Sequence, residues 1–248
     1  MKKKERLKLM PQLSVVVPVY NEEANVEPLL REIVAVVGQD PQQVEILFIN
    51  DGSADQTEAI LLRLKAECPA LWVISFERNA GQSAALACGF LQAKGRILVM
   101  LDGDGQVDPA DIPKIVQLLD EYEVVCGIRR KRRDTLSKRW GSKFANWARR
   151  RVTRDTIVDT GCSLKGFHRE PLQQLYFFDG MHRFLPILLE MQGCSVGQVE
   201  VNHRPRLHGT SKYSNLGRLA KTWQDLLGVR WMQKRKLDYR VKESSDAG

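Results

Sequence analysis

Apolar and polar positions follow two alternating periods along most of this chain, and this pattern predicts a repeating strand–helix unit. Short runs rich in Val, Ile and Leu, typical of buried strands, occur at 13–19, 44–49, 71–76, 96–101 and 124–127. Stretches with helical spacing separate them, at about 21–37, 55–67, 81–93 and 109–120. Asn21 is the expected N-cap of the first helix. Strands that alternate with helices in this way predict a parallel α/β sheet with right-handed crossovers.

The second half of the chain has a less regular pattern. A helix is predicted at about 136–152, with three aromatic side chains on one face: Trp140, Phe144 and Trp147. A turn and a strand are predicted at 159–169, and a further strand at 196–203. The last predicted helix, at about 214–233, is amphipathic, with the apolar stripe Leu216, Leu219, Ala220, Trp223, Leu226, Leu227 and Trp231. No apolar run approaches the roughly 20 residues that a helix needs to span a bilayer.

Length and composition are those of a soluble globular protein with a full core. The chain has 248 residues, of which 43% are hydrophobic and 27% are charged. Its N-terminus lacks the apolar stretch of a signal peptide, which predicts a cytoplasmic location. The five cysteines are spread along the chain without metal-ligand spacing, so we expect them to be small buried apolar residues.

The positive charge is concentrated in one segment. Residues 129–154 contain twelve Lys and Arg and one acid, which gives +11, so the rest of the chain carries −3 of the net +8. A local basic patch indicates an anionic partner. The cations can also be a solvated loop, and the aromatic face at 136–152 can equally be a buried core stripe. Cations around exposed aromatics would fit a helix that lies on an anionic membrane surface.

Two carboxylates stand one residue apart at the end of the fourth predicted strand. Asp102 and Asp104 directly follow the run at 96–101, and Gln106 comes two residues later. In open parallel sheets ligands bind at the carboxyl ends of the strands. Carboxylate and amide oxygens suit Mg²⁺ or Mn²⁺. The alternative is an ordinary Asp-Gly turn, which the neighbouring glycines favour.

Other polar side chains are expected at the same edge of the sheet. They follow the first, second and fifth predicted strands: Tyr20 and Glu22, Asp51 and Ser53, and Arg129. The sequence contains neither the glycine-rich dinucleotide fingerprint nor the phosphate-loop motif. Carboxylates at three strand ends instead favour recognition of ribose and base hydroxyls, with a metal that holds a diphosphate. A nucleotide site is therefore the hypothesis that the residues support.

Six motifs in order resemble the family 2 glycosyltransferases with the GT-A fold. They are Pro-Val-Tyr-Asn-Glu-Glu at 18–23, Asn-Asp-Gly-Ser at 50–53, Asn-Ala-Gly-Gln at 79–82, Asp-Gly-Asp-Gly-Gln at 102–106, Asp-Thr-Gly-Cys at 159–162 and the segment 206–213. Within that family the chain is most similar to the polyprenyl-phosphate sugar transferases such as dolichyl-phosphate mannosyltransferase. The segment 159–164 is similar to the branch that handles undecaprenyl phosphate in bacteria.

The resemblance implies an α/β fold of the GT-A type. Its Rossmann-like, mostly parallel sheet would be flanked by helices, with C-terminal amphipathic helices and no transmembrane segment. The implied organisation is a basic leader at 1–12, a glycosyltransferase domain at 13–215, and an amphipathic helix with a polar tail at 216–248. Within the domain, 13–128 would bind the nucleotide-sugar and 129–215 the acceptor.

The resemblance also implies site residues. The base and ribose of the donor would contact Pro18, Tyr20, Glu22, Ile49 and Asp51. Mg²⁺ or Mn²⁺ and the diphosphate would contact Asp102, Gly103, Asp104 and Gln106. The phosphates of donor or acceptor would face Arg129, Arg206 and Lys212. The expected catalytic residues are Asp102, Asp104 and Arg129.

The implied reaction moves a sugar, with inversion, from a nucleotide-sugar to undecaprenyl or dolichyl phosphate at the inner face of the cell membrane. A phosphate monoester has its second pKa near ~6 and is mostly dianionic at neutral pH. Positioning by cations should therefore matter more than a protein base.

The sequence leaves open two ways in which the chain could reach a lipid acceptor in the membrane. The basic aromatic helix and the terminal helix could hold the chain on an anionic membrane surface, or a small membrane-spanning partner subunit could recruit it. Two rival functions remain. One is a family 2 transferase with a soluble or glycan acceptor in cell-envelope polysaccharide synthesis. The other is a non-catalytic nucleic-acid-binding protein, for which the sequence offers no zinc-finger or base-stacking signature.

Overall fold

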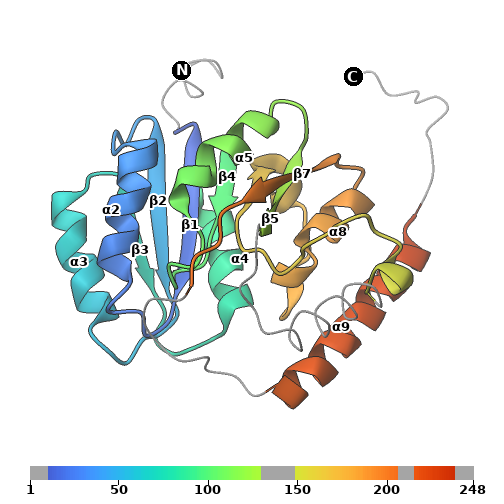
Figure 1. The fold of residues 1–248 in the computed structure, drawn as a ribbon. Helices are drawn as coiled ribbons and strands as arrows, with labels where there is room; N and C mark the ends of the chain where they lie inside the picture. The colour runs from blue at the N-terminus through green and yellow to red at the C-terminus, as the bar shows by residue number, and fades with distance from the viewer. Residues whose placement is uncertain (1–10, 130–148, 206–214, 238–248) are drawn as a thin grey trace, which may run out of the picture.

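The fold is that of a computed structural model, which describes residues 11–129, 149–205 and 215–237, with side chains of the last segment described from Lys221 (Figure 1). The described strands form one seven-stranded sheet in the order β3-β2-β1-β4-β6-β5-β7. They are β1 (Leu13–Val19), β2 (Val44–Asn50), β3 (Leu71–Ser75), β4 (Ile97–Met100), β5 (Val124–Arg129), β6 (Lys165–His168) and β7 (Val196–Val201).

All of these strands run in one direction except β6, which is antiparallel to both β4 and β5. The predicted mostly parallel sheet is confirmed. The simpler expectation, that strand–helix alternation makes every strand parallel, is wrong for β6. The reason is that the segment between β5 and β6 leaves and re-enters the sheet at the same edge, so it does not act as a crossover.

Helices cover both faces of the sheet (Figure 1). One face carries α2 (Val26–Val37), α3 (Thr57–Glu67) and α5 (Ile112–Leu118). The other carries α4 (Gln82–Gln92), α7 (Arg169–Gln173), α8 (Leu185–Met191) and α9 (Asn215–Arg235). Two short 3₁₀ helices complete the described elements, η1 (Pro109–Asp111) and η2 (Met181–Arg183). Each face of the sheet has its own hydrophobic core under its helices. Because side chains alternate along a strand, Val15 and Val17 of β1 lie in the core under α2, α3 and α5, and Val16 lies in the core on the opposite face.

The helices that the sequence predicted in the first half are present with small shifts of their ends. Those at α7 and α8 were not predicted, because five and seven residues are too few to show a helical period. The predicted N-cap of the first helix is wrong. This helix begins at Val26 with Asn25 as N-cap, whereas Asn21 lies four residues earlier with a positive φ of 53°. Asn tolerates that backbone conformation better than most residues.

The apolar stripe predicted for the last helix is buried only in part, and the side chains of Leu216, Leu219 and Ala220 lie outside the described residues. Leu226 and Val229 of α9 are buried, whereas Trp223, Leu227 and Trp231 are 51%, 49% and 62% exposed. The helix therefore packs through Leu226 and Val229 against the core that α8 also covers, and it leaves Trp223 and Trp231 exposed. Helix 136–152 lies outside the described residues except for its end, where residues 149–153 are helical.

Within residues 11–129, 149–205 and 215–237, no helix combines the length and the apolar character that a bilayer crossing requires.

Candidate functional site

The carboxyl ends of β1, β2 and β4 meet at one edge of the sheet because these strands are parallel neighbours. Pro18 of β1 pairs with Ile49 of β2, and both residues are buried. The acidic turn after β4 packs directly on the end of β1. A Cβ atom on Gly103 would lie 2.5 Å from Cγ1 of Val19 and 3.1 Å from the carbonyl oxygen of Pro18. Only a glycine therefore allows this turn to approach β1 so closely.

Asp51 follows β2 and is only 4% exposed. Its carboxylate accepts hydrogen bonds from the loop between β3 and α4: from Nδ2 of Asn79 at 2.9 Å, and from the backbone N–H groups of Ala80 and Gly81 at 2.7 and 2.9 Å. The buried charge of Asp51 is thus held by three donors. Gly52 makes the approach possible, because a Cβ there would lie 2.4 Å from the backbone carbon of Arg78.

The same loop reaches the acids after β4. Gln82, the first residue of α4, donates from Nε2 to Oδ1 of Asp102 at 2.7 Å. Residues 79–82 therefore connect the carboxylate at the end of β2 to the first carboxylate at the end of β4. One loop thus holds the carboxylates at the ends of both β2 and β4.

Asp102 is the group with the most perturbed acidity at this edge. Burial raises its pKa to about 6, and the neighbouring charge of Asp104 adds to the rise. The ammonium of Lys165 and the hydroxyl of Ser163 act in the opposite direction. The backbone N–H of Asp102 also donates to Oγ of Ser163 at 3.3 Å. Two crowded carboxylates whose negative charges repel each other form a place where a cation would be favoured.

Lys165 is a buried cation at the start of β6, 2% exposed. Its Nζ donates to the carbonyl oxygens of Thr160, at 3.3 Å, and of Cys162. It therefore fixes the turn that carries Ser163, while its charge lies near Asp102.

The donor set after β4 fits a divalent cation. Asp104 is 9% exposed, and its Oδ1 accepts the backbone N–H of Gln106 at 3.1 Å, which closes an Asx turn. Within the described residues no cluster of three or more His, Cys, Asp or Glu could hold a metal. A cation here would have Asp102, Asp104 and the Gln106 amide, completed by substrate phosphate and water, the donor set that Mg²⁺ commonly uses.

Arg129 ends β5 and faces the segment 159–163. Its Nε and Nη2 donate to Oδ2 and Oδ1 of Asp159 at 2.7 and 2.8 Å, and its backbone N–H donates to Oδ2 at 3.3 Å. Both side chains are largely buried, at 14% and 10% exposed. A bidentate pair fixes the plane of the guanidinium.

The loops after β1 and β2 are bonded to each other. The backbone N–H of Asn21 donates to Oγ of Ser53 at 2.9 Å, and Oδ1 of Asn21 accepts the N–H of Ala54 at 2.7 Å. The N–H of Glu22 donates to Oγ1 of Thr57 at 2.9 Å. These bonds explain the positive φ of Asn21 and place Glu22 beside the end of β2.

A second contact joins α4 to the half of the chain after β5. Oγ of Ser83 lies 2.9 Å from Nδ1 of His182 and accepts the backbone N–H of Gly180 at 2.9 Å. Arg183, next in the chain, donates from Nη1 to Oγ1 of Thr222 on α9 at 3.0 Å. The N-terminus of α4 is thus supported from both halves of the chain.

The structure brings most of the predicted site residues to one edge. Around the ends of β1, β2, β4 and β5 lie Pro18, Tyr20, Glu22, Ile49, Asp51, Asp102, Gly103, Asp104, Gln106 and Arg129. The side chain of Ile49 is fully buried in the core against α4. Arg206 and Lys212 lie outside the described residues, so their roles stay predictions.

Four supporting residues were not predicted as site residues: Gln82, Ser83, Ser163 and Lys165. The sequence signal was present, since Gln82 lies in one recognised motif and the other three lie close to recognised motifs. Their partners, however, are distant in sequence and only the fold reveals them.

Comparison with protein families and curated proteins gives consistent matches. Residues 14–176 match the family described as "Glycosyl transferase family 2". Over 231 residues the chain is 35% identical to the dodecaprenyl-phosphate galacturonate synthase of Rhizobium johnstonii, covering 91% of this chain and 68% of that protein. Over 218 residues it is 37% identical to the undecaprenyl-phosphate 4-deoxy-4-formamido-L-arabinose transferase of Pseudomonas syringae pv. syringae, covering 87% and 64%. The chain thus spans about two thirds of the length of these relatives.

Solved structures share the fold at lower identity. Glucosyl-3-phosphoglycerate synthase from Mycobacterium tuberculosis, in complex with Mn²⁺, UDP and glucosyl-3-phosphoglycerate, superposes with a TM-score of 0.66 at 21% identity, covering 94% of this chain and 84% of that one. Residues 1–349 of S. aureus TarS give a TM-score of 0.62 at 16% identity, covering 92% and 67%.

Proposed function

Because this chain belongs to glycosyl transferase family 2, we propose that it is an inverting glycosyltransferase that moves a sugar from a nucleotide-sugar donor to a polyprenyl phosphate. The names of both curated relatives describe sugar transfer involving polyprenyl phosphates, which supports this acceptor class. The observation that carries the proposal is the loop 79–82, which holds Asp51 through Asn79, Ala80 and Gly81 and Asp102 through Gln82.

In this proposal each strand end has one task. The loop after β1, with Tyr20 and Glu22, and the carboxylate of Asp51 contact the base and ribose of the donor. Asp102, Asp104 and Gln106 hold Mg²⁺ or Mn²⁺, which when bound neutralises charge on the departing diphosphate. The complex of the mycobacterial neighbour with Mn²⁺ and UDP supports a divalent cation in this fold. Arg206 and Lys212 are proposed to contact phosphates.

The proposed transfer needs no protein base. An oxygen of the acceptor phosphate attacks the anomeric carbon from the side opposite the nucleoside diphosphate. The new carbon–oxygen bond forms as the bond to the diphosphate breaks, and the configuration inverts. Since the acceptor is already mostly dianionic above its second pKa of ~6, the protein has to orient it rather than remove a proton. Arg129, fixed in plane by Asp159, is proposed to perform this orientation.

A lipid acceptor requires contact with a membrane. We place the chain on the inner face of the cell membrane, held by the basic segment 129–154 and the last helix, with a membrane-spanning partner subunit as the alternative means of recruitment. Exposed Trp223 and Trp231 on α9, near exposed cations, support the surface contact.

The proposal is tested by incubating the purified chain with a panel of nucleotide-sugars, Mg²⁺ or Mn²⁺, and undecaprenyl phosphate, and measuring lipid-linked sugar. We expect product with one donor and none without a divalent cation. Asp104→Ala should lower the rate by at least about 100-fold while thermal unfolding stays within a few degrees of the unmodified chain.

Two outcomes would overturn the proposal. Transfer to a soluble or glycan acceptor without lipid would replace the acceptor class. Full activity of Asp104→Ala would remove the metal assignment, and Asp108→Ala is the matched control because Asp108 follows the same turn but caps η1.

A further inference from the structure

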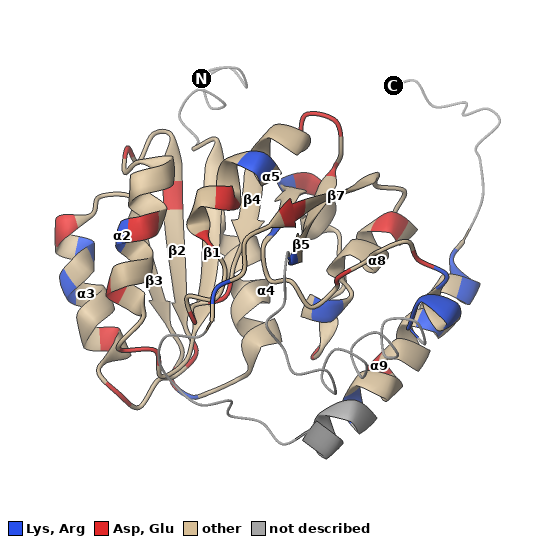
Figure 2. Cartoon of the chain, in the orientation of Figure 1, with Lys and Arg blue, Asp and Glu red and all other residues tan. Residues whose placement is uncertain are grey.

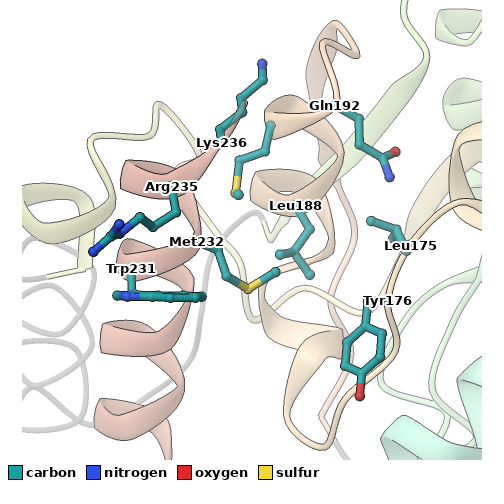
Figure 3. Close-up of a pocket in the computed structure, with 9 residues that line it drawn as sticks. Leu175, Tyr176, Leu188, Gln192, Trp231, Met232, Arg235 and Lys236 are labelled. Atoms are coloured by element: carbon teal, nitrogen blue, oxygen red, sulfur yellow. The ribbon is translucent and has the colours of Figure 1, made fainter. Parts of the chain in front are cut away.

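An open groove of about 380 Å³ lies between α8 and α9, and it belongs to no part of the site described above. It is lined by Leu175, Tyr176, Leu188, Met191, Gln192, Trp231, Met232, Arg235 and Lys236. Figure 3 shows Met232 pointing from α9 toward Leu188 on α8, with Arg235 at the end of α9 and Lys236 just after it. The wall is therefore apolar and flexible, and one end of it is cationic.

The rim of the groove carries large side chains that are exposed to solvent. Tyr176 is 80% exposed, Trp231 is 62% exposed, and Leu237, just after the helix, is 81% exposed. Tyr and Trp have an apolar body and a polar tip, a combination that favours the boundary between hydrocarbon and water. Two such side chains at one groove, with the exposed apolar Leu237 next in the chain after Lys236, indicate a face that meets an interface rather than bulk solvent.

The charge beside the groove has one sign in the C-terminal half of α9 and just after it. From residue 226 to residue 237 the sequence contains four cations and no acid: Arg230, Lys234, Arg235 and Lys236. Figure 2 shows these cations gathered at the C-terminal end of α9. The helical turn 149–153 is joined to this end, because Nε2 of Gln233 donates to the carbonyl oxygen of Thr153 at 2.8 Å, and it adds the exposed Arg150 and Arg151.

We propose that this groove binds an anionic phospholipid of the bilayer. One acyl chain lies along Leu188 and Met232, and the headgroup phosphate contacts Arg235 and Lys236. The charge argues against a second copy of the chain as occupant, because pairing this face with itself would bring two cationic helix ends together. The inference extends the membrane association proposed above, and it does not depend on sugar transfer.

The test uses the full chain and vesicles without donor or acceptor. Phosphatidylglycerol vesicles whose acyl chains carry bromine quench tryptophan fluorescence on contact. Trp231 and Trp223 form a matched pair, since both are exposed on α9 but only Trp231 lines the groove. We expect quenching in the unmodified chain, and a clearly larger loss of it in Trp231→Phe than in Trp223→Phe.

Charge is tested in the same assay. Arg235→Gln combined with Lys236→Gln should lower the vesicle partition coefficient about tenfold or more, whereas Lys221→Gln, an exposed cation outside the groove, should change it less than twofold. Transfer to an acceptor dispersed in detergent should be retained in the double variant, which separates failure of the groove from failure of the proposed function.

Three results would overturn the inference. The first is equal binding to neutral phosphatidylcholine vesicles. The second is a loss of quenching in Trp231→Phe that is no larger than the loss in Trp223→Phe. The third is loss of quenching when a low fraction of undecaprenyl phosphate is added to the vesicles, because the groove would then belong to the acceptor.

Discussion

Arg129 and Asp159 form a bidentate ion pair in which Nε and Nη2 of the arginine donate to the two carboxylate oxygens at 2.7 and 2.8 Å. The pair joins the end of β5 to the turn before β6. The conformation of Arg129 thus depends on a residue 30 positions later in the chain.

Asp159→Asn tests the function of this pair. An amide can accept only one of the two bonds, and it leaves a largely buried guanidinium without its counter-charge, so we expect a loss of about 3 kcal/mol of unfolding free energy. If Arg129 orients the acceptor phosphate, the KM for the acceptor should also rise about tenfold, with the KM for the donor unchanged. Steady-state kinetics and urea unfolding measure the two effects. An unchanged acceptor KM would reduce Arg129 to a structural residue.

Gln82→Met tests the support of Asp102. The variant keeps the length of the side chain and its helical propensity but removes the donor 2.7 Å from Oδ1. Hydrogen bonds favour the ionised carboxylate, so their loss should raise the pKa of Asp102 further. The acidic limb of the pH profile of kcat/KM should move upward by roughly half a unit to one unit. A lower rate with an unshifted profile would mean that Gln82 acts only through packing.

Asp102→Asn should make the metal-free protein more stable. Its pKa of about 6 lies above the ordinary value of 3.8, so the folded state binds the proton more tightly than the unfolded state. Stability is therefore lost as the pH rises from about 4 to about 6 and stays lower above that range. A neutral amide avoids this loss, and we expect a gain of about 1–3 kcal/mol at pH 7.5 that disappears below about pH 4.

Urea unfolding across this pH range, with a chelator present, measures the effect. Transfer should be lost in the same variant. A gain that is equal at pH 4 and pH 7.5 would contradict the assigned cause.

A comparison of Gly52→Ala with Gly38→Ala measures how much the close contact between Gly52 and the start of the loop 79–82 contributes to stability and donor binding. Both glycines have positive φ, 66° and 79°, so both substitutions introduce backbone strain of about 1–3 kcal/mol. Only at Gly52 would the new Cβ collide with backbone, 2.4 Å from the carbonyl carbon of Arg78, whereas nothing lies within 4 Å at Gly38. We expect Gly52→Ala to cost at least about 2 kcal/mol more and to impair donor binding. Thermal unfolding and donor titration would show this difference, and equal costs would argue against it.

The sequence predicted the strand–helix units of the first half well, because β-branched runs and helical spacing are local signals. It also predicted the edge at which Asp51, Asp102 and Arg129 lie, since parallel strands end together. The direction of β6 was not predictable, because it depends on where a long segment returns to the sheet. Which members of the apolar stripe of α9 are buried depends in a similar way on the neighbouring elements, which bury Leu226 and leave Trp223 and Trp231 exposed.

The supporting residues show the same limit. Ser83 was not singled out in the sequence, and nothing local connects it to Gly180 and His182, almost one hundred positions away. Likewise, the sequence alone does not distinguish Lys165 from the many other lysines and arginines of the chain. Its burial beside the acids is a property of the folded sheet.

The reversed direction of β6 has a consequence for which part of the chain can vary. Since β5 ends and β6 begins at the same edge, opposite one another at Cys126 and Lys165, the chain between them departs and returns on the side of the acids. The segment between β5 and β6 can therefore change in length and sequence without altering the register of any strand. The pairing of β6 with β4 and β5 then preserves the geometry of the acidic edge whatever that segment contains.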